Sequence, residues 1–125
     1  MTQATTEATT IERIGVAQRW SDATIFNGII FLAGHCAEKT EGQSLAAQTE
    51  EVLAQLDDTL AQAGSSKERL LSVQIYLTDI SKIAEMNAVY DRWVAPGKPP
   101  ARATVEAKLA KEGWAIEITA VAAKG

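Results

Sequence analysis

Residues 44–63 form the longest periodic segment of the sequence, and they limit how the rest of the chain can fold. Apolar residues recur every three or four positions, as expected for one face of an α-helix, and acidic residues occupy the opposite face. Gly64 follows as a predicted C-terminal cap, because glycine readily adopts the left-handed conformation common there. The apolar face comprises Leu45, Thr49, Val52, Leu53, Leu56 and Leu60.

A second, shorter helix is predicted after Asp79, whose side chain can cap a helix N-terminus. Its apolar stripe consists of Ile83, Met86, Tyr90 and Trp93. Residues 96–100 contain all three prolines of the chain and block any continuation of this helix.

Most of the remaining sequence is typical of β-strands. Asn27-Gly28 predicts a tight hairpin, since both residues tolerate positive φ. The apolar run 29–33 suggests a strand that is buried on both faces, whereas residues 71–78 alternate and have one apolar face. The predicted strands are 11–14, 23–26, 29–33, 71–78, 101–108 and 114–123, with a loop containing Gly113 between the last two.

The predicted order is β-β-β-α-β-α-β-β, an α+β fold in which a mixed sheet carries both helices on one face. At 125 residues the chain is expected to form one domain over 11–125, preceded by a flexible N-terminal tail over 1–10. No segment remains to cover the second sheet face. We therefore expect self-association into a closed cyclic oligomer.

Charge and composition argue against several classes of protein. The net charge is −4 and the basic residues are scattered, which disfavours binding to nucleic acid. The longest apolar run is too short to cross a bilayer, and the polar N-terminus does not resemble a secretory signal. A single cysteine excludes an internal disulfide and favours a reducing, cytoplasmic location.

Arg102 is the first candidate site residue. Pro99 and Pro100 restrict the backbone just before it, and the neighbouring Ala101 and Ala103 leave room beside its side chain. A guanidinium held in this way suits a carboxylate or phosphate. The alternative is an arginine on a solvated strand face.

Glu117 is the second candidate, because it interrupts an apolar strand between two isoleucines. It could exchange a proton with a bound water, or it could simply lie on an exposed face. Arg102 and Glu117 would share a face if Thr104 paired with Glu117 across a hairpin. A shift of one residue would separate them.

The other polar and aromatic candidates are more ambiguous. His35 and Cys36 are adjacent and should point to opposite faces, which disfavours a nucleophilic pair, and Cys36 is interpreted as a packed residue. One histidine and one cysteine do not support a zinc site. Trp20 is a core or interface aromatic or a pocket wall, and Asn87 either is solvated or fixes a loop.

Several segments together resemble the RidA/YjgF family of enamine and imine deaminases. PARATVEAKLAKEGWAIEITAV (residues 100–121) is similar to the family's Pro-x-Arg entry and its later Ile-Glu-Ile strand. NGIIFLAGH (27–35) and EMNAVYDRW (85–93) match its strand with a glycine turn and its second helix. RWSDATIFNG (19–28) resembles the YoaB-like branch, and the likeness covers the chain from about Ile11.

The resemblance implies a chorismate-mutase-like fold assembled as a homotrimeric barrel, with active sites between subunits. It implies hydrolysis of reactive 2-imino and 2-amino-2-alkenoic acids to 2-oxo acids and ammonia without a cofactor or metal. Arg102 would hold the substrate carboxylate, and Glu117 would act on water near the Thr104 backbone. Backbone near Gly34 would border the substrate, Trp20 would form a wall and Asn87 would support the cleft.

Three residues depart from the better-known members of the family. Ala33 replaces a serine, Thr104 replaces a frequent cysteine and Trp20 replaces a tyrosine. These substitutions leave Arg102 and Glu117 in place. They are expected to narrow or shift the range of imino acids that the protein accepts. Two other functions stay open: a trimeric protein that binds small carboxylates without turnover, and a nuclease or translation inhibitor, which the acidic balance disfavours.

Overall fold

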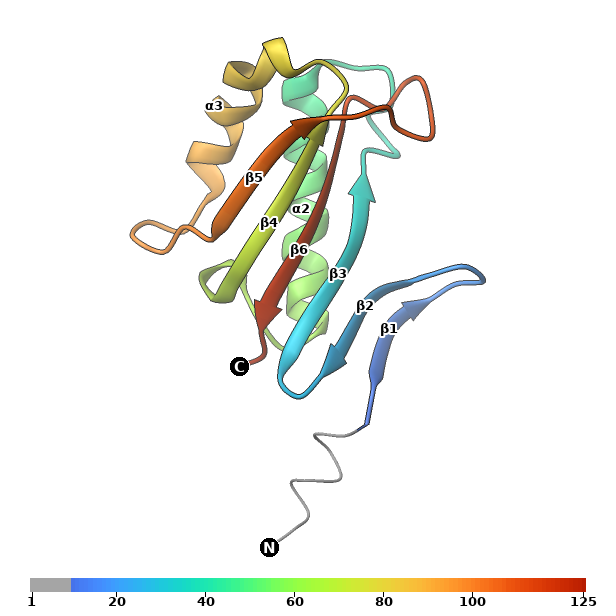
Figure 1. Ribbon diagram of the computed structural model, residues 1–125, viewed down its shortest axis with the longest axis vertical. Coiled ribbons are helices and arrows are strands. Elements are labelled where there is room, and N and C mark those ends of the chain that lie inside the picture. The colour runs from blue at the N-terminus through green and yellow to red at the C-terminus, as the bar shows by residue number, and fades with distance from the viewer. Residues whose placement is uncertain (1–9) are drawn as a thin grey trace, which may run out of the picture.

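The computed structural model describes residues 10–125, in which six strands form one mixed sheet of order β1-β2-β3-β6-β4-β5 (Figure 1). Only β4 and β5 are parallel; all other neighbours are antiparallel. The tail predicted for residues 1–10 lies outside the described residues, apart from Thr10. The strands are β1 (Glu12–Val16), β2 (Ser21–Phe26), β3 (Ile29–Cys36), β4 (Leu70–Leu77), β5 (Ala101–Glu106) and β6 (Ile116–Ala123).

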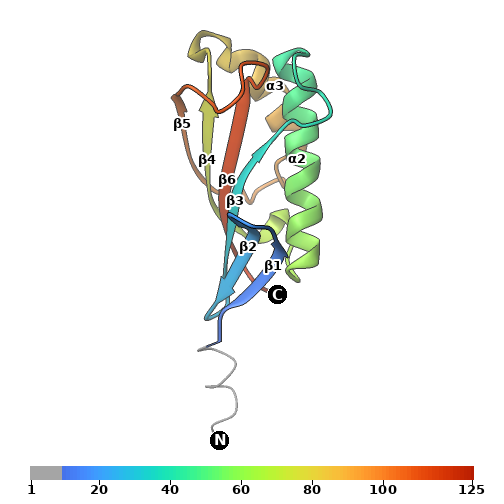
Figure 2. The same cartoon turned by 90° about the vertical axis from the view of Figure 1, so that its right-hand side faces the viewer.

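Both helices pack on the same face of this sheet (Figure 2), as the sequence predicts. Helix α2 (Leu45–Gln62) begins after Ser44, whose side chain accepts a hydrogen bond from Ala47 N. Helix α3 (Ile83–Trp93) follows a short 3₁₀ turn, η2 (Ile80–Lys82), and Asp79 caps that turn through Ser81 N. A second 3₁₀ turn, η1 (Lys67–Arg69), precedes β4.

Local turn chemistry behaves as predicted at two points. Asn27 and Gly28 have φ values of 55° and 78° and join β2 to β3 in a tight hairpin. Gly64 follows α2 with φ 80°, and Ser65 N donates to the carbonyl of Leu60 across it. The apolar face of α2, including Leu56 and Leu60, lies fully buried against the sheet.

The last two strands do not form a hairpin with each other, contrary to the pairing considered from the sequence. Strand β4 lies between β5 and β6, and Thr104 pairs with Ile75 instead of Glu117. The reason is the crossover through α3: a helical connection returns the chain parallel to β4 and places β5 at the sheet edge. The loop between β5 and β6 then crosses the end of β4, so that β6 pairs with β4 on the side opposite to β5.

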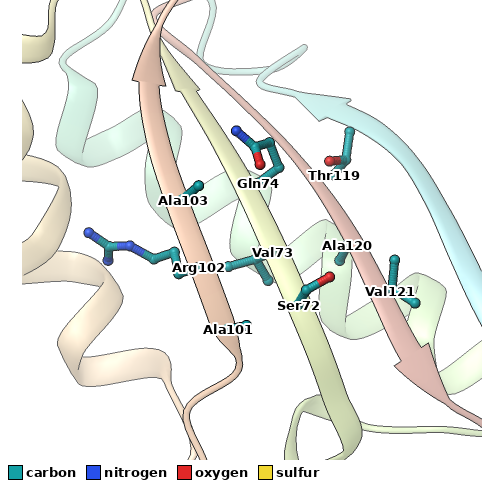
Figure 3. A pocket seen from close by; sticks show the side chains of 9 residues that line it. All are labelled: Ser72, Val73, Gln74, Ala101, Arg102, Ala103, Thr119, Ala120 and Val121. Atoms are coloured by element: carbon teal, nitrogen blue, oxygen red, sulfur yellow. The ribbon is translucent and has the colours of Figure 1, made fainter.

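The second face of the sheet is covered by no described part of the chain (Figure 2). Large apolar side chains lie exposed on it, including Phe31 at 48% and Val105 at 41%. Near the outer edge the face is hollowed by small residues, Ala101, Ala103 and Ser72, in a depression of about 300 Å³ (Figure 3). An uncovered apolar face of this kind marks an interaction surface.

Candidate functional site

Arg102 projects from the edge strand β5 toward α3 (Figure 3). It pairs with Val73, which pairs in turn with Ala120, and both partners are buried on the helix side. The Arg102 Cζ lies 4.8 Å from the centre of the Tyr90 ring on α3. Burial raises the pKa of the Tyr90 phenol, and the nearby guanidinium opposes part of that rise. Stacking on a buried ring therefore orients an otherwise exposed cation.

Two buried polar atoms lie on the same two elements, β5 and α3. Thr104 is two residues beyond Arg102 on the same side of β5, and Asn87 is one turn before Tyr90 on α3. Helix α3 runs in the direction opposite to β5 (Figure 1). Moving from Arg102 to Thr104 along β5 therefore goes the same way in space as moving from Tyr90 back to Asn87 along α3. Neither Thr104 Oγ1 nor Asn87 Oδ1 has a hydrogen-bond partner among the described residues. Such atoms are available to a ligand.

Glu117 lies on the opposite, open face of the sheet. It alternates with the buried Ile116 and Ile118 on β6 and pairs with Tyr76 and Cys36 of the neighbouring strands. The Cys36 thiol donates a hydrogen bond to Glu117 Oε1, with a separation of 3.4 Å between Sγ and Oε1. The other oxygen, Oε2, lies against Gly34, where a Cβ atom would collide with it.

A bulge in β3 brings Cys36 and Gly34 to this carboxylate. Leu32 pairs with Ala120 and His35 with Ile118, so two residues of β3, Ala33 and Gly34, oppose one of β6. The extra residue reverses the alternation, and Cys36 faces the open side together with Glu117. The predicted strand 29–33 stops before Gly34, whereas β3 continues through this glycine to Cys36. Reading Gly34 as an interruption within a longer strand is the sequence signal that could have revealed the bulge.

Glu117 lines a pocket of about 640 Å³ beside the free end of β3. Strand β2 pairs with β3 only as far as Leu32, so the rest of β3 is unpaired on that side and forms a wall of the pocket. Trp20 lines this pocket and is 58% exposed, so it is not a core residue of the protomer. Its exposure fits both the interface aromatic and the pocket wall considered from the sequence. The lining also includes Ala33, Gly34, Asp22, Glu38 and Asp58.

His35 and Cys36 point to opposite faces, as predicted. The His35 ring lies on the helix side, where Nδ1 donates to the carbonyl of Ala33 at 2.7 Å and Nε2 lies 3.0 Å from Thr59 Oγ1. The sequence interpretation of Cys36 as a merely packed residue missed its hydrogen bond to Glu117. The bulge in β3 places the Cys36 side chain on the same face as Glu117 of β6, and this contact cannot be predicted from the β3 sequence alone.

The predicted site residues therefore form two separate groups within one protomer. Arg102 and Thr104 lie on the helix side of β5 and Asn87 lies on α3, whereas Glu117, Gly34, Ala33 and Trp20 line the pocket beside β3. The two groups lie on opposite faces of the sheet with β4 between their strands. The shared face considered from the sequence is not present in a single chain.

Residues 10–125 contain neither a candidate metal-binding cluster nor a helix that could span a membrane. No cluster of three or more His, Cys, Asp or Glu side chains in this range is arranged to hold a metal ion. Neither helix in it is long and apolar enough to span a membrane.

The family model and the curated relatives that match this chain all point to the same protein family. The family model described as "Endoribonuclease L-PSP" matches residues 10–124. A RutC family protein of Haemophilus influenzae is 43% identical over 113 residues, covering 90% of this chain and 97% of that protein. The RutC family protein YoaB of Escherichia coli is 39% identical over 114 residues, covering 91% and 98%.

Solved structures agree with this result. The structure of NMB1025 from Neisseria meningitidis, described as a member of the YjgF protein family, superposes with a TM-score of 0.91 at 47% identity. The superposition covers 94% of this chain and 98% of that one. The fold and its site-bearing strands are therefore shared along nearly the whole chain.

Proposed function

Because the chain belongs to the RidA/YjgF family, in the branch that includes YoaB, we propose that it hydrolyses reactive 2-imino and 2-amino-2-alkenoic acids to 2-oxo acids and ammonia. Such a reaction protects a cell from electrophilic intermediates and needs only a carboxylate anchor, a positioned water and a group that moves protons. The two groups of side chains described above can supply these elements.

The observation that carries the proposal is the arrangement around Arg102. The guanidinium is stacked on Tyr90 beside two buried polar atoms, Thr104 Oγ1 and Asn87 Oδ1, that have no partner among residues 10–125. The guanidinium fork matches a substrate carboxylate in two parallel hydrogen bonds. The stiff Pro99-Pro100 entry limits its movement, so the imine carbon next to the carboxylate is held in one place.

Glu117 acts on the water in this mechanism. The water oxygen adds to the imine carbon while its proton passes to Glu117, which returns the proton to the imine nitrogen and so gives a neutral carbinolamine. Glu117 then takes the proton of the carbinol hydroxyl and delivers it to the amino nitrogen while the carbon–nitrogen bond breaks. Ammonia leaves, the carbinol oxygen becomes the carbonyl of the 2-oxo acid, and Glu117 is ionised again.

Two protomers are needed to complete the site, since Arg102 and Glu117 lie on opposite sheet faces of one chain. We propose a homotrimer in which the uncovered face of one protomer packs against its neighbour. This packing would bury Phe31 and Val105 and bring the Glu117 pocket of one chain to Arg102 of the next.

The test uses imino acids generated in situ by an amino-acid oxidase, with 2-oxo acid formation followed in competition with a trapping amine. We expect wild-type protein to accelerate hydrolysis and Arg102→Ala to lower kcat/KM roughly 10- to 100-fold, the effect of losing charged hydrogen bonds. Arg92→Ala is the matched control, because Arg92 is an exposed arginine that pairs with Glu50 on the helix layer. Equal rates for wild type and Arg102→Ala would contradict the proposal.

A second candidate is a trimer that binds small carboxylates without turnover, which the unpartnered polar atoms at Thr104 and Asn87 also favour. Thermal stabilisation by a 2-oxo acid, lost in Arg102→Ala and accompanied by no hydrolysis, would support binding alone. The description of the matching family model names an endoribonuclease. The net charge of −4 weighs against RNA binding, and RNA retention at low salt tests it directly.

A further inference from the structure

The two oxygens of the Glu117 carboxylate have different neighbours. Oε1 accepts the hydrogen bond from the Cys36 thiol, with Sγ at 3.4 Å. Oε2 lies over the bulge at Gly34, on the side of the pocket that also holds Trp20. Because Oε1 is hydrogen-bonded to the thiol, Oε2 is the oxygen of Glu117 that can contact a ligand in the pocket.

Cys36 is itself held in place by the helix layer. Its carbonyl accepts a hydrogen bond of 3.0 Å from Gln55 Nε2 on α2, and the same nitrogen donates to Glu51 Oε2 at 3.0 Å. The Glu51 carboxylate in turn accepts from the backbone nitrogens of Lys39 and Thr40. This network ties the end of β3 to α2 and limits the movement of the thiol.

The thiol remains protonated at any physiological pH. Burial, together with the charge of the neighbouring Glu117 and the hydrogen bond to it, raises the pKa of Cys36 to about 12. Cys36 is therefore a permanent donor toward Glu117 and a poor nucleophile.

From this geometry we infer that Cys36 is a positioning residue: its S–H holds Glu117 Oε1, so that Oε2 beside Gly34 is the oxygen that takes the proton from the attacking water. The inference rests on the proposed hydrolytic function. A thiol is a weak donor, so it orients the carboxylate through one oxygen and leaves the other oxygen to act on the water.

Other charged and titratable groups surround this pair, and they stay unchanged in the variants below. They come from every neighbouring element: Asp22 on β2, His35 on β3, Glu38 after β3, Asp58 on α2 and Tyr76 on β4.

The experiment compares Cys36→Ala, Cys36→Ser and Cys36→Val. Serine keeps a donor at position 36, whereas valine fills the space without one. We expect Cys36→Ala and Cys36→Val to lower kcat by roughly three- to tenfold, the contribution of one weak hydrogen bond. Cys36→Ser should retain most of the wild-type kcat.

The pH dependence separates positioning from packing. Losing a donor disfavours the ionised carboxylate, so the acidic limb of the kcat profile should move to higher pH in Cys36→Ala and Cys36→Val, by up to about one pH unit. In Cys36→Ser the limb should stay in place or move to lower pH. If valine rescues activity and serine does not, Cys36 serves only packing and the inference is wrong.

Glu117→Gln distinguishes failure of this inference from failure of the proposed function. If Glu117→Gln keeps full activity, the assignment of Glu117 fails, and with it the proposed mechanism. If Glu117→Gln loses activity while all three Cys36 variants match wild type in kcat and pH profile, only the role of Cys36 is refuted. In the Glu117→Gln background, Cys36→Ala should cause no further loss.

Discussion

Gly34 lies in the bulge of β3, where the Glu117 carboxylate occupies the space that a side chain would fill. Its φ lies outside the left-handed region, so any side chain at this position acts through contact and not through backbone strain. Gly42 presents the opposite case: it has φ 82° and open space around it. The two glycines therefore serve different purposes, one at the site and one in a turn.

We predict that Gly34→Ala displaces Glu117 and lowers kcat by about 100-fold, the effect expected when a catalytic group moves by about an ångström. Its free energy of unfolding should change little, because the carboxylate can turn into the open pocket. Gly42→Ala, the control, should lose about 1–2 kcal/mol of stability while each folded molecule stays active. Urea unfolding and steady-state kinetics on both variants check this; an active Gly34→Ala would contradict it.

Individual site residues differ in how far the sequence could predict their surroundings. Pro99-Pro100 pointed to a restrained Arg102, and the structure adds the Tyr90 ring that orients it. The site roles of Thr104 and Asn87 are implied by the family resemblance, and their buried oxygens without a partner among residues 10–125 are visible only in the fold. The contact between Cys36 and Glu117 escaped prediction, because it joins residues 81 positions apart through a bulge.

At the level of elements, helix α2 contains a residue that links it to the strand carrying Glu117. Gln48 is 1% exposed and lies on the apolar face of the helix. Its Nε2 donates to the carbonyls of Gln43 and Gly113, and its Oε1 accepts from Ala115 N at 2.9 Å. One amide thus fixes the loop that leads into β6.

Gln48→Leu should lower the free energy of unfolding by about 1–3 kcal/mol, because it leaves the Ala115 N–H without its partner. Gln43→Leu is the control: the side chain is exposed, and a change of less than about 0.5 kcal/mol is expected there. Chemical denaturation of both variants gives the comparison. Equal stabilities would show that Gln48 contributes packing volume only.

The order of strands in the sheet could not be obtained from their individual patterns. Residues 101–106 and 116–123 are recognisable as strands, and a hairpin is the simplest way to join neighbours in sequence. The crossover of α3 overrides this by placing β5 parallel to β4 at the edge. This strand order separates Arg102 from Glu117 by β4 and leaves their side chains on opposite faces, so they do not meet within a chain.

On the scale of the whole molecule, one face of the sheet is unprotected in the monomer. Phe31 and Val105 are exposed there, and the depression beside them is lined by small residues. The proposed trimer would remove this apolar surface from water and complete the site at the same step.

Wild-type protein should therefore have three times the chain mass of 13.4 kDa in sedimentation equilibrium. Phe31→Glu should shift it toward monomer, because a charge cannot be buried without a partner. Hydrolytic activity should fall in parallel with the trimer fraction. A fully active monomer would refute the shared site.

Mixed trimers test the division of the site between chains. Arg102→Ala and Glu117→Gln are each expected to be nearly inactive alone. After co-refolding in equal amounts, about a quarter of the sites should combine an intact Arg102 with an intact Glu117 from a neighbour, by random cyclic assembly. Recovery of that activity is the expected result. Mixed trimers confirmed by mass spectrometry but without activity would contradict the division.

The sequence by itself determined the elements and their order, because periodicity and turn chemistry depend on near neighbours along the chain. The burial of 29–33 on both faces was predicted wrongly, since Phe31 is exposed on the open face of the monomer. It also identified Arg102 and Glu117 as unusual residues within their strands. Only the tertiary structure decided that β4 separates them, that Tyr90 orients the arginine and that Cys36 reaches the carboxylate. Strand order and bulges depend on contacts between distant segments, and a shift of one residue reverses every side chain of a strand.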